Sequence, residues 1–227
     1  MLHIKWTGKN SIKKMNIHYL NNGIDTSKFL FNMQHRISIR EEFGIQDKFV
    51  LGTIGRLSPE KNHMFMVDVL VEMLKIRDDA VLLIVGGLSE THEEYTRHIK
   101  LYVEEKGMKN KVIFTGERHD AYRIFNAIDA YLFPSLWEGL GIAAVEAQAN
   151  GLQVFASNHV PEEVNLTEHI QYLALESGAE EWVKKIVGYN YSNSRKDSCK
   201  EIRKRGYDIR DSAKELQEIY INLSKEN

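Results

Sequence analysis

Short apolar runs alternate along the chain with longer segments in which apolar residues recur at helical spacing. The short runs are rich in β-branched and aromatic residues and end near Gly, Pro or Asn, which is typical of buried strands. Five strands are predicted at 49–55, 80–87, 111–116, 129–135 and 153–158. Residues 15–21 and 170–175 are weaker strand candidates. Six helices are predicted at 62–76, 93–107, 121–128, 141–150, 179–190 and 207–223.

This alternation of strand and helix predicts an α/β fold. Continuous apolar strands are typical of a mostly parallel sheet covered on both faces, and right-handed crossovers then give a Rossmann-like, doubly wound sheet. Such sheets bind ligands beyond the carboxyl ends of their strands. Glycines follow the predicted strands at that edge, at positions 55, 86, 87, 116, 139 and 141.

Composition excludes several classes of protein. The 227 residues are 43% apolar and 27% charged, which is ordinary for a globular chain, and the net charge of −2 predicts no nucleic-acid partner. The single cysteine, Cys199, excludes an internal disulfide and fits a reducing compartment. No apolar run approaches the roughly 18 residues of a membrane span, and the first 15 residues lack the apolar region of a signal peptide. We therefore expect a cytoplasmic location.

The segment TIGRLSPEKN (53–62) predicts an anion site. It leaves a strand and enters a helix, with Ser58 as N-cap and Pro59 at the first helical position. Arg56 and Lys61 then lie beside the positive end of the helix dipole, an unfavourable placement unless an anion such as a diphosphate binds between them. The alternative is a solvated turn with two surface cations. The segment is not a Walker A loop.

A second group of residues follows the strand at 129–135. Glu138 precedes Gly139 and Gly141, which let a ligand approach the backbone, and Glu146 lies inside the following helix. A carboxylate can accept hydrogen bonds from two neighbouring hydroxyls of a sugar or a ribose. Alternatively, both glutamates only favour the helix dipole. With the anion site, the pair outlines a nucleotide-sugar.

Residues 139–144 (GLGIAA) also fit the dinucleotide fingerprint G-x-G-x-x-A. That fingerprint belongs in the first strand–helix turn, whereas this match follows several strands. It also requires an acidic residue at the end of the next strand, where this chain has Asn158 and His159. These departures argue against NAD.

In these motifs the chain resembles family four of the retaining glycosyltransferases with the GT-B fold. EGLGIAAVE has the family's E-x7-E pattern, GRLSPEKN its G-R-x-x-x-x-K motif, and NNGIDTSKF (21–29) the segment that opens its second domain. The segment ASNHVPEEVNLTEHIQYLAL resembles the branch that builds capsular and exopolysaccharides. The resemblance runs from about residue 16 to the end.

The resemblance implies a role for each matching position. Arg56 and Lys61 would hold the donor diphosphate, Glu138 the donor sugar and Glu146 the ribose. The backbone of residues Gly139, Leu140 and Gly141 would approach the sugar and phosphate, and the turn from Gly116 to Arg118 would contact the base. Such enzymes use no metal or other cofactor, and the sequence has no HExxH motif or cysteine cluster. The branch implies UDP rather than GDP.

The family carries an acceptor-binding domain before the segment at 21–29, and here fewer than 25 residues precede it. We therefore expect an N-terminal remnant at 1–15, a donor-binding domain at 16–190 and a C-terminal helical extension at 191–227. Because the family's last helix packs on the missing domain, apolar residues of the extension should be partly exposed or join a dimer contact. These are Ile209, Leu216, Ile219 and Tyr220.

The resemblance leaves three functions open. The first is a glycosyltransferase domain that transfers a sugar from a nucleotide donor to a saccharide or lipid-linked acceptor. The second is a donor-binding module that is inactive alone because it lacks an acceptor site. The third is a nucleotide-sugar epimerase of the same architecture. The basic run at 194–205 is expected to be a solvated helix face, with peripheral attraction to the inner face of a membrane as the alternative.

Overall fold

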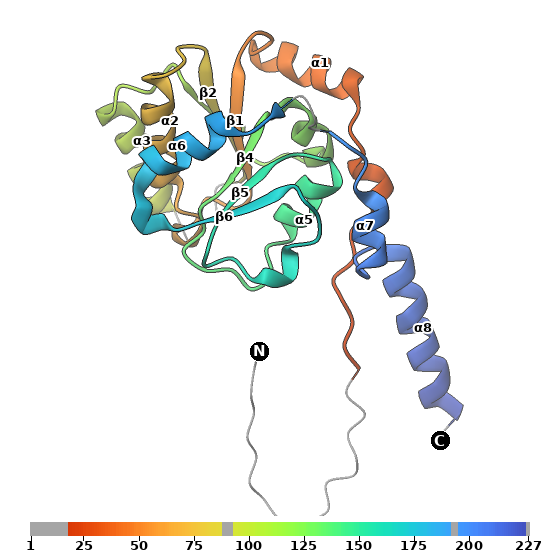
Figure 1. Ribbon diagram of the computed structural model, residues 1–227. Coiled ribbons are helices and arrows are strands. Elements are labelled where there is room, and N and C mark those ends of the chain that lie inside the picture. The colour runs from red at the N-terminus through yellow and green to blue at the C-terminus, as the bar shows by residue number, and fades with distance from the viewer. Residues whose placement is uncertain (1–17, 88–92, 192–194, 226–227) are drawn as a thin grey trace, which may run out of the picture.

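The computed structural model describes residues 18–87, 93–191 and 195–225. Its centre is one parallel sheet of six strands in the order β3-β2-β1-β4-β5-β6 (Figure 1). The strands are β1 (Phe49–Ile54), β2 (Ala80–Val85), β3 (Val112–Phe114), β4 (Ala130–Phe133), β5 (Val154–Ser157) and β6 (Ile170–Leu173). This confirms the Rossmann-like α/β fold predicted from the sequence, including the weak strand candidate at 170–175.

The strand order places a topological switch point between β1 and β4. From β1 the chain moves outward through β2 to β3, then returns to β4, which pairs with β1 through Leu51 and Ala130. Helices therefore leave β1 and β4 toward opposite faces, which opens a crevice at the carboxyl ends of these two strands.

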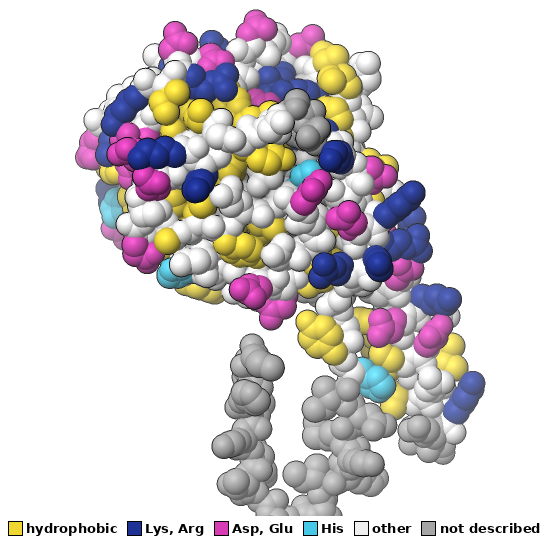
Figure 2. Space-filling view, viewed as in Figure 1, with side chains coloured by type: hydrophobic (Ala, Val, Ile, Leu, Met, Phe, Trp, Pro, Cys, Tyr) yellow, Lys and Arg dark blue, Asp and Glu magenta, His cyan; other side chains and the backbone are white. Residues whose placement is uncertain are grey.

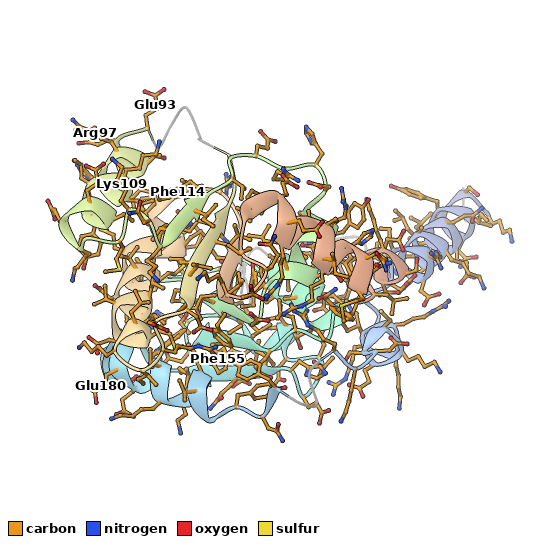
Figure 3. All side chains as sticks on the ribbon, turned by 90° about the horizontal axis from the view of Figure 1, so that it is seen from above. Glu93, Arg97, Lys109, Phe114, Phe155 and Glu180 are labelled. Atoms are coloured by element: carbon orange, nitrogen blue, oxygen red, sulfur yellow. The ribbon has the colours of Figure 1, made fainter. Side chains whose placement is uncertain are left out.

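Two apolar cores cover the two faces of the sheet. On one face, α2 (His63–Leu74), α3 (Glu93–Glu105) and α6 (Gly178–Gly188) pack against strand residues such as Leu51, Leu82 and Phe155. On the other face lie α1 (Met33–Phe43), α4 (Ala121–Ile124), α5 (Ile142–Ala149) and α7 (Cys199–Lys204). In Figure 3, Phe155 lies inside the molecule, whereas Glu93 and Glu180 point outward from α3 and α6.

The structure corrects two sequence predictions and adds one helix. Residues 18–21 form no strand, and 15–17 lie outside the described residues. Tyr19 is exposed, and Ile24, further along the chain, forms an isolated β-bridge with Asp208. The predicted helix 121–128 is α4 followed by a 3₁₀ turn, Phe125–Ala127. Helix α1 was missed because its buried side chains are only Ile39 and Arg40, too few for an apolar stripe.

The final helix, α8 (Ile209–Lys225), projects from the body of the molecule (Figure 1). Its apolar residues Ile209, Leu216 and Tyr220 are exposed and Ile219 is half-buried, as predicted. Figure 2 shows apolar side chains among the charged ones along this helix. None of the helices in the described part of the chain is long and apolar enough to cross a membrane. The division at residues 15 and 190 stays a prediction.

Candidate functional site

The crevice at the switch point brings Lys61 and Glu138 together. Lys61 follows β1, Glu138 follows β4, and the Lys61 Nζ lies 2.5 Å from the Glu138 Oε1. The Ser135 hydroxyl donates to the same oxygen at 2.7 Å. Both side chains are largely withdrawn from water, with 18% of Lys61 and 9% of Glu138 exposed. Lys61, predicted for the phosphate site, and Glu138, predicted for the sugar site, therefore form one ion pair in the ligand-free chain.

The turn that carries Lys61 differs from the prediction. Ser58 and Pro59 begin a separate 3₁₀ turn, Pro59–Lys61, and Asn62 in the left-handed conformation separates it from α2. Ser58 makes no side-chain cap hydrogen bond. Lys61 therefore ends this turn and does not occupy the first turn of α2. The turn points the Lys61 side chain across Gly55 toward Glu138.

The loop after β4 is fixed to its neighbours by hydrogen bonds. The Leu136 N–H donates to the Glu60 carbonyl at 2.8 Å, which joins this loop to the Lys61 turn. The Ser157 hydroxyl at the end of β5 donates to the Ser135 carbonyl at 2.5 Å. These bonds hold Glu138 in place before any ligand binds.

Arg56 and Arg118 line one cavity of about 390 Å³ beside this ion pair. The Arg56 side chain is 75% exposed, and its nearest carboxylate in the described residues is Glu60 at 3.9 Å. Arg118 is held by Asp120 at 2.8 Å and by Glu42 at 2.6 Å, and these hydrogen bonds raise its pKa. Arg56 is therefore free to turn toward a ligand anion, whereas Arg118 is already neutralised.

Gly55, Gly86 and Gly87 line this cavity, and the Gly116 carbonyl accepts a hydrogen bond from the Gly86 N–H. A Cβ on Gly86 would lie 1.8 Å from the Gly55 carbonyl oxygen, so no side chain fits there. Gly116 has a φ of 73°, which favours glycine. A Cβ on Gly87 would lie 3.2 Å from the Cβ of Glu117, a cavity residue that the sequence analysis did not identify.

Glu146 lies in the second turn of α5 and is half-buried. Burial raises the pKa of its carboxyl to about 7, against a smaller opposing effect of Lys28. The buried Tyr131 hydroxyl, which donates to the Ile54 carbonyl at 3.0 Å, lies in the field of both Glu146 and Glu138. Both carboxylates add to the burial effect that raises the pKa of Tyr131. Glu146 and Glu138 therefore both lie within electrostatic range of Tyr131.

The glycines at the start of α5 have separate roles. Gly141 has a φ of 87° and precedes the first residue of the helix, a conformation that favours glycine. A Cβ on Gly139 would meet no atom within 4 Å, so this position is open to a ligand. Leu140 packs against the core, so only its backbone can face the crevice. Among the described residues, no group of three or more His, Cys, Asp or Glu side chains is placed to hold a metal ion.

Sequence reasoning missed Ser135, Tyr131 and Glu117 at this site. Ser135 is three residues before Glu138, and this spacing in a loop after a strand was the one available signal. Tyr131 and Glu117 act through contacts made only in the folded chain, and nothing in the local sequence marks them.

Residues 35–208 match the family model for glycosyl transferases group 1. The putative glycosyltransferase EpsF of Bacillus subtilis is 28% identical over 225 residues, which cover 96% of this chain and 56% of that relative. The Escherichia coli UDP-Gal:alpha-D-GlcNAc-diphosphoundecaprenol alpha-1,3-galactosyltransferase is 30% identical over 151 residues, or 65% of this chain and 38% of that enzyme. The chain spans about half the length, or less, of the curated relatives that it matches.

Two solved structures show the same fold. Anabaena Alr3699/HepE in complex with UDP and glucose superposes with a TM-score of 0.75 at 22% identity, covering 90% of this chain and 56% of that one. The C-terminal domain of the Francisella tularensis glycosyl transferase LpcC superposes with a TM-score of 0.67 at 18% identity, covering 82% of this chain and 100% of that one.

Proposed function

The chain belongs to the family of group 1 glycosyl transferases, and we propose that it is the C-terminal, donor-binding part of a retaining enzyme of this family. The donor is a nucleotide-diphosphate sugar, with UDP favoured over GDP, and binding needs no metal. The observation that carries the proposal is the Lys61–Glu138 ion pair at the carboxyl ends of β1 and β4, beside the open position Gly139.

The geometry supports a separate role in donor binding for each residue along the crevice. Lys61 and Arg56 bind the diphosphate and stabilise the negative charge that develops as the sugar leaves, which is electrostatic catalysis. Glu138 accepts hydrogen bonds from sugar hydroxyls over Gly139. Glu146, deeper in the crevice, accepts hydrogen bonds from the ribose hydroxyls, and the turn from Gly116 to Arg118 contacts the base.

Donor binding in this scheme rearranges the ion pair. In the free chain Lys61 neutralises Glu138, so neither charge is available to a ligand. A diphosphate attracts Lys61 more strongly than one carboxylate does, because it carries more negative charge. When Lys61 moves to the phosphate, Glu138 is released toward the sugar hydroxyls, and Ser135 keeps it oriented.

Two relatives support the choice of donor and acceptor. The name of the Escherichia coli relative specifies a UDP-sugar donor and a diphosphoundecaprenol-linked acceptor, and HepE was crystallised with UDP. We infer that the acceptor of the whole enzyme is a saccharide or a lipid-linked saccharide in polysaccharide synthesis. In the proposed whole enzyme, the acceptor-binding domain is a different domain from the one that this chain matches. Peripheral attachment at the inner face of the membrane, with a cytoplasmic active site, would bring the donor and the acceptor together.

The isolated chain is therefore expected to bind the nucleotide and to transfer no sugar. We would titrate it calorimetrically with UDP, GDP and NAD in separate runs with EDTA present. Binding of UDP or GDP but not NAD supports a metal-independent donor site and identifies the base. A chain that binds none of the three, or binds NAD, contradicts the proposal. Transfer of radiolabelled sugar by the purified chain would contradict the expected lack of turnover.

A further inference from the structure

A second cavity, of about 640 Å³, lies at the opposite end of the sheet from the donor crevice. Its lining includes Phe49 at the start of β1, Asp79 just before β2 and Asp129 just before β4. Because parallel strands carry their ligand sites at the carboxyl ends, this amino-end cavity belongs to a separate part of the molecule. Its volume is in the range of small-molecule sites.

Two arginines of α1 share a single carboxylate in this cavity. The Arg36 Nη2 lies 2.5 Å from Asp129 Oδ1, and the Arg40 Nη2 lies 2.6 Å from Asp129 Oδ2. The Val50 N–H also donates to Asp129 Oδ2 at 2.8 Å. Both oxygens of this carboxylate are therefore occupied, and one negative charge opposes two positive ones.

Arg195 adds a third guanidinium and has no carboxylate partner among the described residues. It hydrogen-bonds the Phe125 and Ile128 carbonyls and the Asn150 side-chain oxygen. Burial lowers its pKa to about 9, repulsion from Arg36 and Arg40 adds to the effect, and attraction to Asp129 opposes it. Its backbone is left-handed, with a φ of 75°, which is unfavourable for a residue with a Cβ. The sequence analysis had placed this residue on a solvated helix face, and the structure corrects that.

The cavity carries an excess of positive charge. Five cationic side chains line it, namely Arg36, Arg40, Lys48, Arg77 and Arg195. Three carboxylates oppose them, from Asp47, Asp79 and Asp129. Lys48 forms no ion pair within the described part of the chain, whereas Arg77 is paired with Asp79. The lining therefore has two more positive charges than negative ones.

Capping of the 3₁₀ turn Phe125–Ala127 explains part of this arrangement. Arg36 donates to the Asn126 carbonyl at 2.9 Å and Arg40 to the Ala127 carbonyl at 3.0 Å. Carbonyl groups satisfy hydrogen-bond donors, but they do not neutralise charge. A partly buried, uncompensated positive charge is unfavourable, and a bound anion would remove that penalty.

Aromatic rings form the other side of the cavity. The Arg77 guanidinium lies 4.1 Å from the Phe49 ring centroid, and the Arg195 guanidinium lies 5.0 Å from that of Phe31. Met33, at the start of α1, is 55% exposed at the cavity mouth. A ligand that fits these surroundings has an anionic group for the arginines and a flat or apolar body for the rings.

We propose that this amino-end cavity binds a small organic phosphate, as a second site separate from the donor crevice. The phosphate lies against Arg36 and Arg195 with Lys48 at the rim, and the organic part packs on Phe31 and Phe49. Because the site is at the other end of the sheet, its ligand does not compete with a nucleotide-sugar.

The probe is phenyl phosphate, titrated calorimetrically into the whole chain. We expect binding that Arg36→Gln and Lys48→Gln each weaken roughly tenfold or more, the effect of one lost charged contact. Lys75→Gln, which changes an exposed cation outside the cavity lining, should leave affinity unchanged. Lys61→Ala, in the donor crevice, should also leave it unchanged.

Arg36→Gln removes an ion pair, so its fold is checked by thermal unfolding, and Lys48→Gln carries the test alone if that variant is unfolded. No binding of phenyl phosphate to the folded chain overturns the proposal. So does binding that Lys61→Ala abolishes and Lys48→Gln preserves, because this would place the phosphate in the donor crevice. Attachment to phosphatidic acid vesicles without any affinity for phenyl phosphate would also overturn it, in favour of a membrane surface.

Discussion

Replacing Lys61 by alanine tests the donor site directly. The side chain is 18% exposed and its ammonium group lies 2.5 Å from Glu138, so it is held at the point where the diphosphate is expected. Loss of one hydrogen bond to a charged group costs about 1.5–3 kcal/mol. We expect Lys61→Ala to weaken UDP binding by that amount, or roughly tenfold to 150-fold in Kd.

The same change should also destabilise the fold. Without Lys61, Glu138 is a carboxylate with 9% of its side chain exposed, and Ser135 is its one remaining side-chain partner among the residues that the structure describes. Because the pair is near the surface, the loss should be about 1–2 kcal/mol, below that of a fully buried pair. Adding Glu138→Gln removes the unpaired charge, so the double variant should recover stability without recovering UDP affinity.

The assay combines calorimetric titration with UDP and urea unfolding of each variant. Lys75→Ala is the control, because it removes a cation that is 64% exposed and lies outside the crevice. Glu138→Gln alone should bind UDP at least as tightly as the original chain, since no ion pair must open. Unchanged UDP affinity in folded Lys61→Ala would refute the phosphate assignment. Loss of UDP affinity in Glu138→Gln would refute the exchange of Lys61 between carboxylate and phosphate.

Four further predictions concern single positions. Gly139→Ala should change the free energy of unfolding by less than about 0.5 kcal/mol yet weaken UDP-sugar binding relative to UDP, because its Cβ enters open space. Gly141→Ala should destabilise by about 1–2 kcal/mol in urea unfolding, because its φ is 87° and its Cβ would lie 3.0 Å from Phe133 Cε1; equal stability of the two variants would contradict this. The pKa of Glu146 is raised from 4.5 to about 7, so the folded chain holds this proton more tightly than the unfolded chain. The free energy of unfolding should therefore fall as the pH rises from 4.5 to 7, by roughly 3 kcal/mol at most. Glu146→Gln should lack this loss when unfolding is measured across the same pH range. Burial raises the pKa of Cys199 to about 12, so a disulfide reagent at pH 8 should modify it at least about 100-fold more slowly in the native chain than in urea, and equal rates would contradict its burial.

The fold could be predicted where burial leaves a pattern in the sequence. Strands β1, β2, β4 and β5 are buried on both faces, and each was visible as a continuous apolar run. Helix α1 was not, since most of its surface faces water. Its end signals were present, however: Asn32 accepts hydrogen bonds from the N–H groups of Gln34 and His35, and Gly44 ends the helix with a φ of 64°. Reading caps as well as periodicity would have found it.

The candidate site shows a different limit. The sequence motifs named Lys61 and Glu138, but their pairing spans 77 positions and depends on β1 and β4 being neighbours. That adjacency follows from the strand order, which local patterns do not encode. The raised pKa of Glu146 is likewise a property of the folded chain, because it depends on how deeply α5 is packed.

Arg195 shows why charge patterns in sequence are ambiguous. It lies in a run of basic residues, and such runs usually form solvated surfaces. Here the 3₁₀ turn Phe125–Ala127 ends in carbonyls with no helical partner, and a guanidinium can reach them because it carries five donors on a long side chain. The fold therefore buries the guanidinium of Arg195, whereas Lys196 and Lys200 of the same run stay exposed. Which cation is buried depends on which distant carbonyls lack donors, and the same burial leaves beside Asp129 the positive charge that a ligand anion could neutralise.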